Sequence, residues 1–206
     1  MLFESVARNA LGLALFAALT VGVIAVTELV TRDAIAEQRA RAQQRALLAI
    51  LGEEGFDNAI LEDVLPIEAG VLGLREDAEA YVARKDGAAV ALVVPLVAPD
   101  GYSGAIRMLL GIRVDGVIAG LRILEHRETP GLGDAIEARK SDWILGFAGR
   151  SLADPGPGGW AVRKDGGEFD AFTGATITPR AVVAAVHDAL QWYRGVGRRR
   201  LEEVAP

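Results

Sequence analysis

The sequence predicts an α+β protein, in which a single N-terminal transmembrane helix and a helical stalk precede an antiparallel sheet with flanking helices. Three observations predict this arrangement. Residues 10–27 contain no charged residue, residues 88–126 are rich in apolar segments separated by turn signals, and helical spacing of apolar residues returns after residue 179. The period of the apolar pattern therefore changes from helical to extended and back along the chain.

Composition limits the classes of function. The 206 residues suffice for one ordinary domain plus an extra segment. The net charge of -6 argues against a broad basic surface, so we expect no nucleic-acid partner and a solvated arginine run at residues 198–200. The absence of cysteine excludes disulfides, thiolate nucleophiles and Cys-ligated metal centres. His126 and His187 have no recognisable ligand spacing, so no metal site is predicted.

The apolar run Ala10–Thr27 has the length of a membrane-spanning helix. At about 1.5 Å per residue, eighteen helical residues cover roughly 27 Å, close to the thickness of the hydrocarbon core. A cleaved signal peptide is the alternative, because Ala34–Ala36 offers a small-x-small site. The run is longer than a usual signal-peptide core, so we expect a retained, single-pass helix, with residues 1–30 forming a short tail and the membrane span.

The orientation of this helix is left open by the charges beside it. Arg8 is the only basic residue before the run, whereas four arginines follow it within the next eighteen residues. A simple count places the bulk of the chain in the cytoplasm. Long domains, however, are translocated largely regardless of their charge, so the count decides little.

Residues 31–84 are expected to form the stalk and a connecting segment. Residues 31–51 are rich in Ala, Gln, Arg and Leu and end before Gly52, which favours a helix that leaves the membrane. Residues 55–74 are expected to form short helices and loops.

Residues 85–206 are expected to form the main domain. Residues 88–98 are apolar and β-branched, typical of a buried strand, and Pro95 indicates an edge or a bulge. The apolar segments 105–114 and 117–126 are separated by Asp115-Gly116. Asp-Gly in this position predicts a hairpin closed by a type I′ turn, in which both central residues have positive φ.

A glycine-rich loop follows the hairpin at residues 126–134. Pro130, Gly131 and Gly133 exclude a regular element there, and Asp134 is a suitable N-cap for a helix over residues 135–149. Such a loop can present backbone N–H groups to a ligand. The alternative is a helix entry loop without a ligand.

The segment before the last helix holds three threonines, Thr173, Thr176 and Thr178. A helix is predicted to begin near Pro179, with Thr178 as its N-cap. Its apolar positions are Val182, Val183, Val186, Leu190 and Tyr193.

Thr176 lies just before this predicted helix start, where unpaired N–H groups and the helix dipole favour a phosphate. Gly174 permits close approach of the backbone, and Ala175 leaves room beside it. A glycine turn followed by a capped helix explains the same residues without a ligand. The spacing cannot show a covalent bond.

These motifs resemble those of a known family. Residues 170–176, Asp-Ala-Phe-Thr-Gly-Ala-Thr, resemble the D-x-x-[ST]-G-A-[ST] signal of FMN-binding domains that carry flavin through a phosphoester to the last threonine or serine. Residues 101–112, 115–134 and 164–178 are similar, in order, to blocks of the G subunit of the Rnf electron-transport complex. The resemblance covers about residues 85–195, and the N-terminal helix and total length also fit.

The resemblance implies a membrane-anchored electron carrier with FMN attached through its phosphate to Thr176. A separate flavin transferase would recognise Asp170 and the Thr-Gly-Ala-Thr stretch. Because the flavin ring carries the redox chemistry, no catalytic side chain is expected. Further cofactor contacts are expected from Thr173, Gly174, Ala175, Thr178, Glu128, Thr129, Gly131, Leu132 and Gly133.

The same resemblance implies partners and a location. The partners would be membrane lipid and the other Rnf subunits, which couple electron flow between ferredoxin and NAD to ion movement. The chain would lie in the bacterial inner membrane with its C-terminal domain on the periplasmic side.

Three alternatives are kept. A related subunit of the sodium-pumping NADH:quinone reductase carries a similar flavin domain but is expected to be longer. A stand-alone flavoprotein reductase would need a second catalytic module, and none is visible. A structural anchor without flavin would have no use for Thr176.

Overall fold

The computed structural model describes residues 2–52 and 54–204. The chain divides into two compact units, Met1–Gln43 and Gln44–Pro206. Helix α1 (Leu2–Leu51) makes up the first unit and contributes its last two turns to the second. The predicted continuation of the apolar helix through residues 31–51 is therefore confirmed.

The first unit is an apolar helix with exposed side chains. Its most apolar stretch has a mean hydropathy of 2.3 and buries nothing against the rest of the described chain. The hydroxyls of Thr20 and Thr27 donate to the carbonyls of Phe16 and Val23, at 3.0 and 2.8 Å, so these polar groups are satisfied within the helix. The helix is long and apolar enough to span a membrane.

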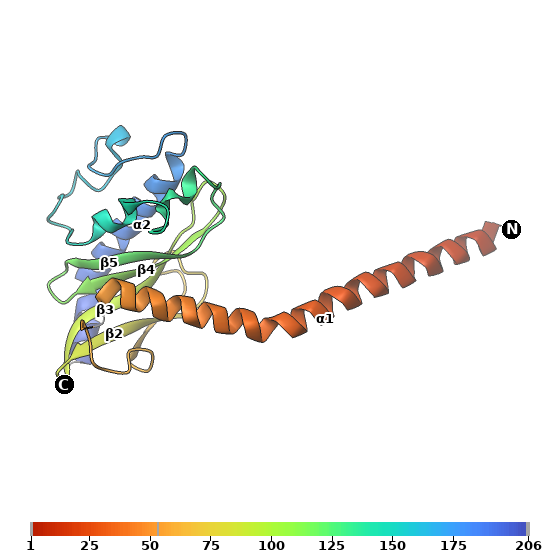
Figure 1. Ribbon diagram of the computed structural model, residues 1–206, viewed down its shortest axis with the longest axis horizontal. Helices are drawn as coiled ribbons and strands as arrows, with labels where there is room; N and C mark the ends of the chain where they lie inside the picture. Colours follow the sequence, from red (N-terminus) through yellow and green to blue (C-terminus); the bar gives the residue numbers. More distant parts are fainter. Residues whose placement is uncertain (1, 53, 205–206) are drawn as a thin grey trace. The chain divides into compact units, whose positions relative to one another are not determined.

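The second unit is built on a five-stranded antiparallel sheet in the order β1-β2-β3-β4-β5 (Figure 1). The strands are β1 (Val64–Ile67), β2 (Ala78–Lys85), β3 (Ala88–Ala98), β4 (Ile106–Arg113) and β5 (Ile118–Glu125). The predicted α+β class with an antiparallel sheet is confirmed. The first two strands begin before residue 85, where the main domain was expected to begin.

The expectation of short helices over residues 55–74 is wrong. All of these residues are described, none is helical, and β1 lies among them. A strand of four residues that includes Pro66 is too short to show the alternation by which strands are recognised.

Two short turns connect β2 to β3 and β4 to β5. The β4–β5 hairpin is confirmed, but its turn is not type I′. Three residues, Val114–Gly116, form the loop, and Gly116 alone has a positive φ of 85°. The type I′ pattern occurs instead between β2 and β3, where Asp86 and Gly87 have φ of 52° and 82°. This second hairpin was not predicted.

Pro95 occupies an edge, as predicted. The pairing of β3 with β2 ends at Val93, so the second half of β3 borders only β4. Val97 donates its N–H to the carbonyl of Leu72 and not to β4. Pro95 lies two residues before Val97, so its backbone nitrogen points to the same side of the strand, away from β4. The missing donor of Pro95 therefore breaks no bond of the ladder.

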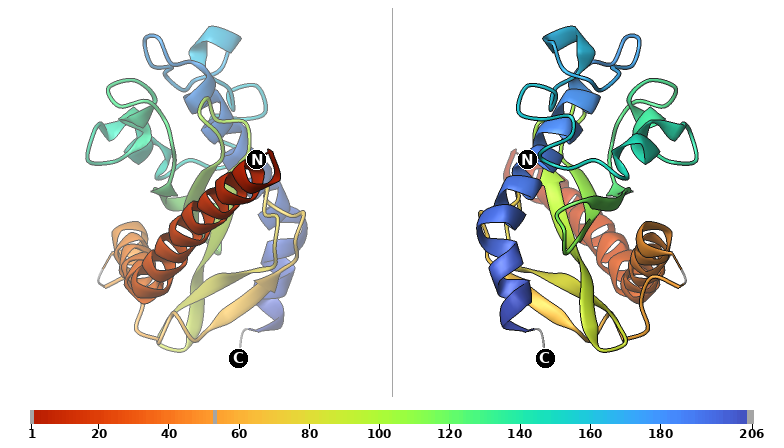
Figure 2. Two further views of the ribbon diagram at one scale, coloured as in Figure 1. Left: turned by 90° about the vertical axis from the view of Figure 1, so that its right-hand side faces the viewer. Right: turned by 90° about the vertical axis from the view of Figure 1, so that its left-hand side faces the viewer.

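Different helices cover the two faces of the sheet (Figures 1 and 2). Helix α2 (Ile177–Trp192) packs on one face and continues into a π-helical turn (Tyr193–Gly197) and α3 (Arg198–Glu203). The last turns of α1 pack on the other face through Ala46, Leu47 and Ile50. Both faces of the sheet are therefore buried by residues distant in sequence from the strands.

A pair of glycines receives the end of α1. Gly111 and Gly120 lie opposite each other on β4 and β5. A Cβ atom at Gly111 would lie 2.3 Å from Cγ2 of Ile50, and one at Gly120 would lie 3.2 Å from its Cα. The guanidinium of Arg122 donates to the carbonyl of Ala49 at 2.8 Å, satisfying a carbonyl at the helix C-terminus.

The connection from β5 to α2 contains three short 3-10 helices, Gly133–Ile136, Asp142–Phe147 and Arg163–Asp165. The single helix predicted over residues 135–149, with Asp134 as its N-cap, is wrong. Asp134 lies inside the first short helix, and Ser141 caps the second. The Ser141 hydroxyl donates to the carbonyl of Ala135 at 2.7 Å and accepts from the N–H of Trp143 at 3.2 Å. Such local bonds compete with a continuous helix.

We expect Gly111→Ala to destabilise the protein by about 1–3 kcal/mol, because the added methyl overlaps Ile50. Chemical denaturation of the purified protein measures this. Gly146→Ala is the control, since a Cβ there meets nothing within 4 Å. Equal stability of the Gly111→Ala and Gly146→Ala proteins would contradict the packing described here.

Candidate functional site

The two stretches predicted to contact a cofactor lie together at one end of the sheet. The hydroxyl of Thr178 donates to Oε2 of Glu128 at 2.5 Å, and the exposed fractions of these residues are 0% and 4%. A Cβ at Gly133 would lie 2.6 Å from the same Glu128 oxygen. One at Gly174 would lie 3.5 Å from Cδ2 of Leu132. The loop after β5 therefore packs directly on the segment that begins α2.

A third loop joins them, and sequence reasoning missed its role. Residues 101–104 connect β3 to β4, and the N–H of Ser103 donates to Oε1 of Glu128 at 3.0 Å. A Cβ at Gly101 would lie 3.0 Å from that oxygen. The two glycines of this short connection were a signal of close backbone approach. Glu128 thus uses both carboxyl oxygens to tie three segments together.

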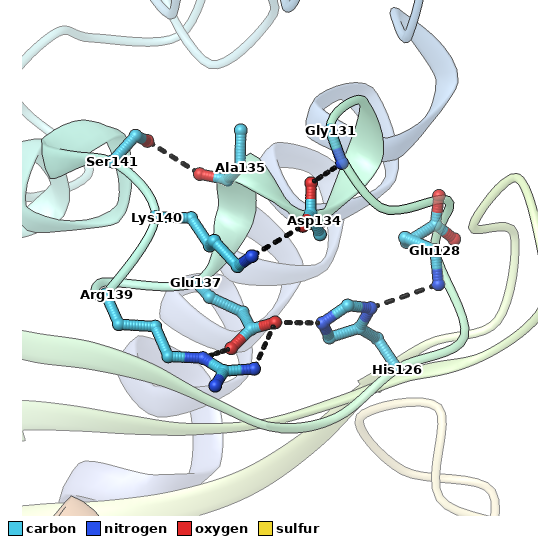
Figure 3. Close-up of polar contacts among 9 residues, drawn as sticks. All are labelled: His126, Glu128, Gly131, Asp134, Ala135, Glu137, Arg139, Lys140 and Ser141. Atoms are coloured by element: carbon cyan, nitrogen blue, oxygen red, sulfur yellow. Dashed lines mark hydrogen bonds and ion pairs between the residues drawn. The ribbon is translucent and has the colours of Figure 1, made fainter.

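His126 fixes the backbone of this loop (Figure 3). Its Nδ1 accepts from the N–H of Glu128 at 3.0 Å, so the ring proton lies on Nε2, which is 3.0 Å from Oε1 of Glu137. Arg139 binds the Glu137 carboxylate as well. The hydrogen bond from Arg139 lowers the pKa of Glu137, burial opposes that shift, and the bond with His126 adds to it.

The loop satisfies several of its own N–H groups (Figure 3). Gly131 donates to Oδ1 of Asp134 at 2.7 Å, and Leu132 donates to the carbonyl of Thr129 at 3.1 Å. The other carboxyl oxygen of Asp134 lies 3.4 Å from Nζ of Lys140. These N–H groups are therefore occupied inside the loop. What the loop exposes toward solvent includes Gly131 and the side chain of Leu132.

The helix start differs from the prediction. Helix α2 begins at Ile177, two residues before Pro179, so Thr178 lies within its first turn rather than at the N-cap. Thr176 occupies the N-cap position, is half-buried and makes no side-chain capping hydrogen bond. Thr178 could not be recognised as a partner of Glu128 because fifty residues separate them in sequence.

A tight turn precedes Thr176. Ala175 donates its N–H to the carbonyl of Phe172 at 3.0 Å, and Gly174, the third residue of the turn, has a φ of +80°. Positive φ at that position is typical of a type II turn and favours glycine. Thr173 is exposed at its tip. Asp170, before the turn, is exposed, and its carboxylate lies 2.9 Å from Nε of Arg163.

This geometry suits a phosphorylated, partly apolar ligand. The hydroxyl of Thr176 lies at the positive end of a sixteen-residue helix, where an anionic phosphate is stabilised. The converging loops also expose three apolar side chains, Tyr102, Leu132 and Ile177, by 68%, 43% and 44%. The fold and the site are therefore those of an α+β domain with a candidate site for a phosphorylated ligand, preceded by an apolar helix long enough to span a membrane.

Comparison with known proteins identifies the kind of domain. Residues 101–191 match the model of the FMN-binding domain, and residues 1–50 match the RnfG N-terminal region. The chain is 50% identical over 199 residues to the G subunit of the ion-translocating oxidoreductase complex of Pseudomonas aeruginosa, covering 96% of this chain and 92% of that protein.

Two further relatives carry the same name. The protein of Vibrio atlanticus is 44% identical, with 93% of this chain and 91% of that protein aligned. The protein of Cronobacter sakazakii is 47% identical, with coverages of 91% and 90%. The chain therefore belongs to the family of G subunits of ion-translocating oxidoreductase complexes, and the predicted family is confirmed.

Two neighbouring threonines are expected to respond differently to the same substitution. Thr178→Val should destabilise the protein by about 1–3 kcal/mol, because Glu128 loses a buried donor. Thr176→Val should change stability by less than about 0.5 kcal/mol, because no side-chain capping bond is lost. Denaturant titration of flavin-free protein compares them, with Thr178→Ser as the control that keeps the hydroxyl. A larger loss of unfolding free energy from Thr176→Val than from Thr178→Val would refute the structural role given to the Thr178 hydroxyl.

Stability should depend on pH through Glu137. Because the folded-state pKa is lowered, the contribution of this carboxylate is fully present above the ordinary glutamate pKa of about 4.3 and is lost as pH falls through the lower folded value. Thermal stability between roughly pH 5 and pH 3 should therefore fall more steeply for the native sequence than for Glu137→Gln. Parallel curves for the two proteins would exclude this contribution.

Proposed function

We propose that this chain carries FMN covalently on Thr176 and relays electrons as the G subunit of an Rnf-type complex. Membership of the family and the FMN-binding domain support the role of an electron-transfer flavoprotein subunit of an ion-translocating oxidoreductase complex. The proposal of covalent attachment depends on the position of Thr176. Thr176 is a half-buried residue at the N-cap of α2, and its hydroxyl makes no capping bond.

The three threonines have different capacities for attachment. Thr178 is fully buried and its hydroxyl is bound to Glu128, so it is unsuited to carry a bulky group. Thr173 is exposed at the tip of the turn. It precedes the first turn of α2, so the helix dipole has little effect on a group attached to its hydroxyl. Thr176 combines access with the helix N-terminus, and it is the last threonine of the Asp-Ala-Phe-Thr-Gly-Ala-Thr motif.

The residues of the chain would bind and orient the cofactor without reacting themselves. A bound flavin supplies the redox chemistry through its ring. The phosphate would rest at the start of α2, and the exposed side chain of Leu132 lies beside the turn at Gly174. The bonds made by Glu128 hold these segments together.

The proposal extends to maturation and location. A flavin transferase would recognise the exposed Asp170 and the Thr-Gly-Ala-Thr stretch. The other Rnf subunits would be the partners, passing electrons between ferredoxin and NAD and moving ions. The apolar helix α1 would cross the bacterial inner membrane once, with the C-terminal domain on the periplasmic side.

The kept alternatives are less well supported. A subunit of the sodium-pumping NADH:quinone reductase is disfavoured because relatives named as G subunits of the ion-translocating oxidoreductase complex align over nine-tenths of both chains. A structural anchor without flavin is disfavoured because residues 101–191 match an FMN-binding domain.

Replacing Thr176 by Val should abolish flavin attachment while the fold persists. The native chain, purified from cells that contain the transferase, should gain the mass of FMN less one water and show fluorescence that survives denaturation. Thr176→Val should show neither, and Thr173→Ser, which keeps the recognised [ST]-G-A-[ST] pattern, should retain both. Intact mass and in-gel fluorescence measure this. A native chain without the adduct, despite an active transferase, would overturn the covalent assignment.

A further inference from the structure

Trp143 connects the core of the domain to the stretch that precedes Thr176. Its indole Nε1 donates to the carbonyl of Asp170 at 2.8 Å. Its ring meets the ring of Phe172 edge to face, with centroids 5.1 Å apart and planes at 70°. One side chain thus holds two points of the stretch, twenty-seven and twenty-nine residues away in sequence.

Trp143 is itself held firmly. It lies in the second short helix, whose cap Ser141 accepts its backbone N–H at 3.2 Å. Its ring also meets the ring of Phe147, at a centroid distance of 5.2 Å, and Phe147 is fully buried in the main core. The indole therefore links the stretch to the core.

The other tie on Asp170 is weaker. Its carboxylate pairs with Arg163, but both side chains are more than two-thirds exposed, and such pairs contribute little to stability. The turn bond from Ala175 to Phe172 is internal to the stretch and does not attach it to the domain. The two ends of the stretch are anchored, because buried Phe169 stacks on Phe147 with centroids 4.7 Å apart and Thr178 is bound to Glu128. Trp143 contacts Asp170 and Phe172, which lie between these anchors.

We propose that Trp143 is a positioning residue, whose indole N–H and ring fix the turn at residues 172–175 so that Thr176 is presented for modification. It binds the Asp170 carbonyl before the turn and the Phe172 ring at the start of the turn. The consequence for flavin attachment rests on the proposed function, whereas the positioning of the turn does not.

Trp143→Phe removes the N–H donor and keeps a ring. The matched control is Trp160→Phe, because the indole of Trp160 also donates to a carbonyl, that of Ser151 at 3.3 Å, and also packs on Phe147. The Trp160 ring meets Phe169, before the stretch, but within the described part of the chain it makes no ring contact with Phe172 and no hydrogen bond to Asp170. The first measurement is amide hydrogen exchange in the full-length, flavin-free protein. Exchange of the Ala175 N–H should quicken roughly three- to tenfold in Trp143→Phe, the size expected for loss of one hydrogen bond.

The reference in this experiment is the amide of Leu110 in β4, which should keep its exchange rate in both variants. Trp160→Phe should leave exchange at Ala175 unchanged. A merely structural role for Trp143 would instead alter both amides together. Unchanged exchange at Ala175 in Trp143→Phe overturns the proposal.

The second measurement is the fraction of chain carrying flavin, by intact mass, at a fixed early time after the transferase is induced. It should fall several-fold in Trp143→Phe and stay at the native level in Trp160→Phe. Native loading of Trp143→Phe despite faster exchange overturns the role in presentation. If the native chain takes up no flavin, the proposed function fails, and the exchange experiment still decides the positioning.

A second variant guards against misfolding of the first. Phe172→Leu removes the aromatic ring that Trp143 meets and leaves the indole N–H of Trp143 in place. It should also quicken exchange at Ala175, and an unchanged rate would count against the proposal. Thermal unfolding of each variant shows that the assays are made on folded protein.

Discussion

The arrangement of the site depends on one buried carboxyl group. Glu128 accepts from Ser103 on one oxygen and from Thr178 on the other, joining a strand connection, the loop after β5 and the first turn of α2. A buried polar group is tolerable only when its partners are present. The three segments therefore keep one mutual arrangement, because any movement that separates them leaves a polar atom unsatisfied.

Packing on the sheet fixes the position of the helix that carries Thr178. Helix α2, which carries Thr178, also packs along one face of the sheet, so the site end of the helix cannot shift without disturbing the core. On the opposite face the glycine pair admits Ile50 close to the strands. Cores packed this closely transmit displacement instead of absorbing it. The positions of the loops are thus set by packing across the whole domain.

The sequence predicted what depends on local pattern. The apolar helix, the central strand with its edge proline and the β4–β5 hairpin each follow from residues that are neighbours in the chain. Two roles were missed because the partners are distant in sequence. Thr178 and Ser103 both bind Glu128, fifty and twenty-five residues away. The other errors are local, since Ser141 binds the backbone on both sides and interrupts the helix expected over residues 135–149, and the type I′ pattern lies at Asp86-Gly87 and not at Asp115-Gly116.

The hydroxyl of Thr176 takes no part in the hydrogen bonds that hold the described loops together, and this bears on the order of biogenesis. The contacts made by Glu128, His126 and Trp143 are all internal to the chain. If Thr176 carries flavin as proposed, none of these contacts has to be broken or rebuilt when the group is added, so folding and loading would be separable steps.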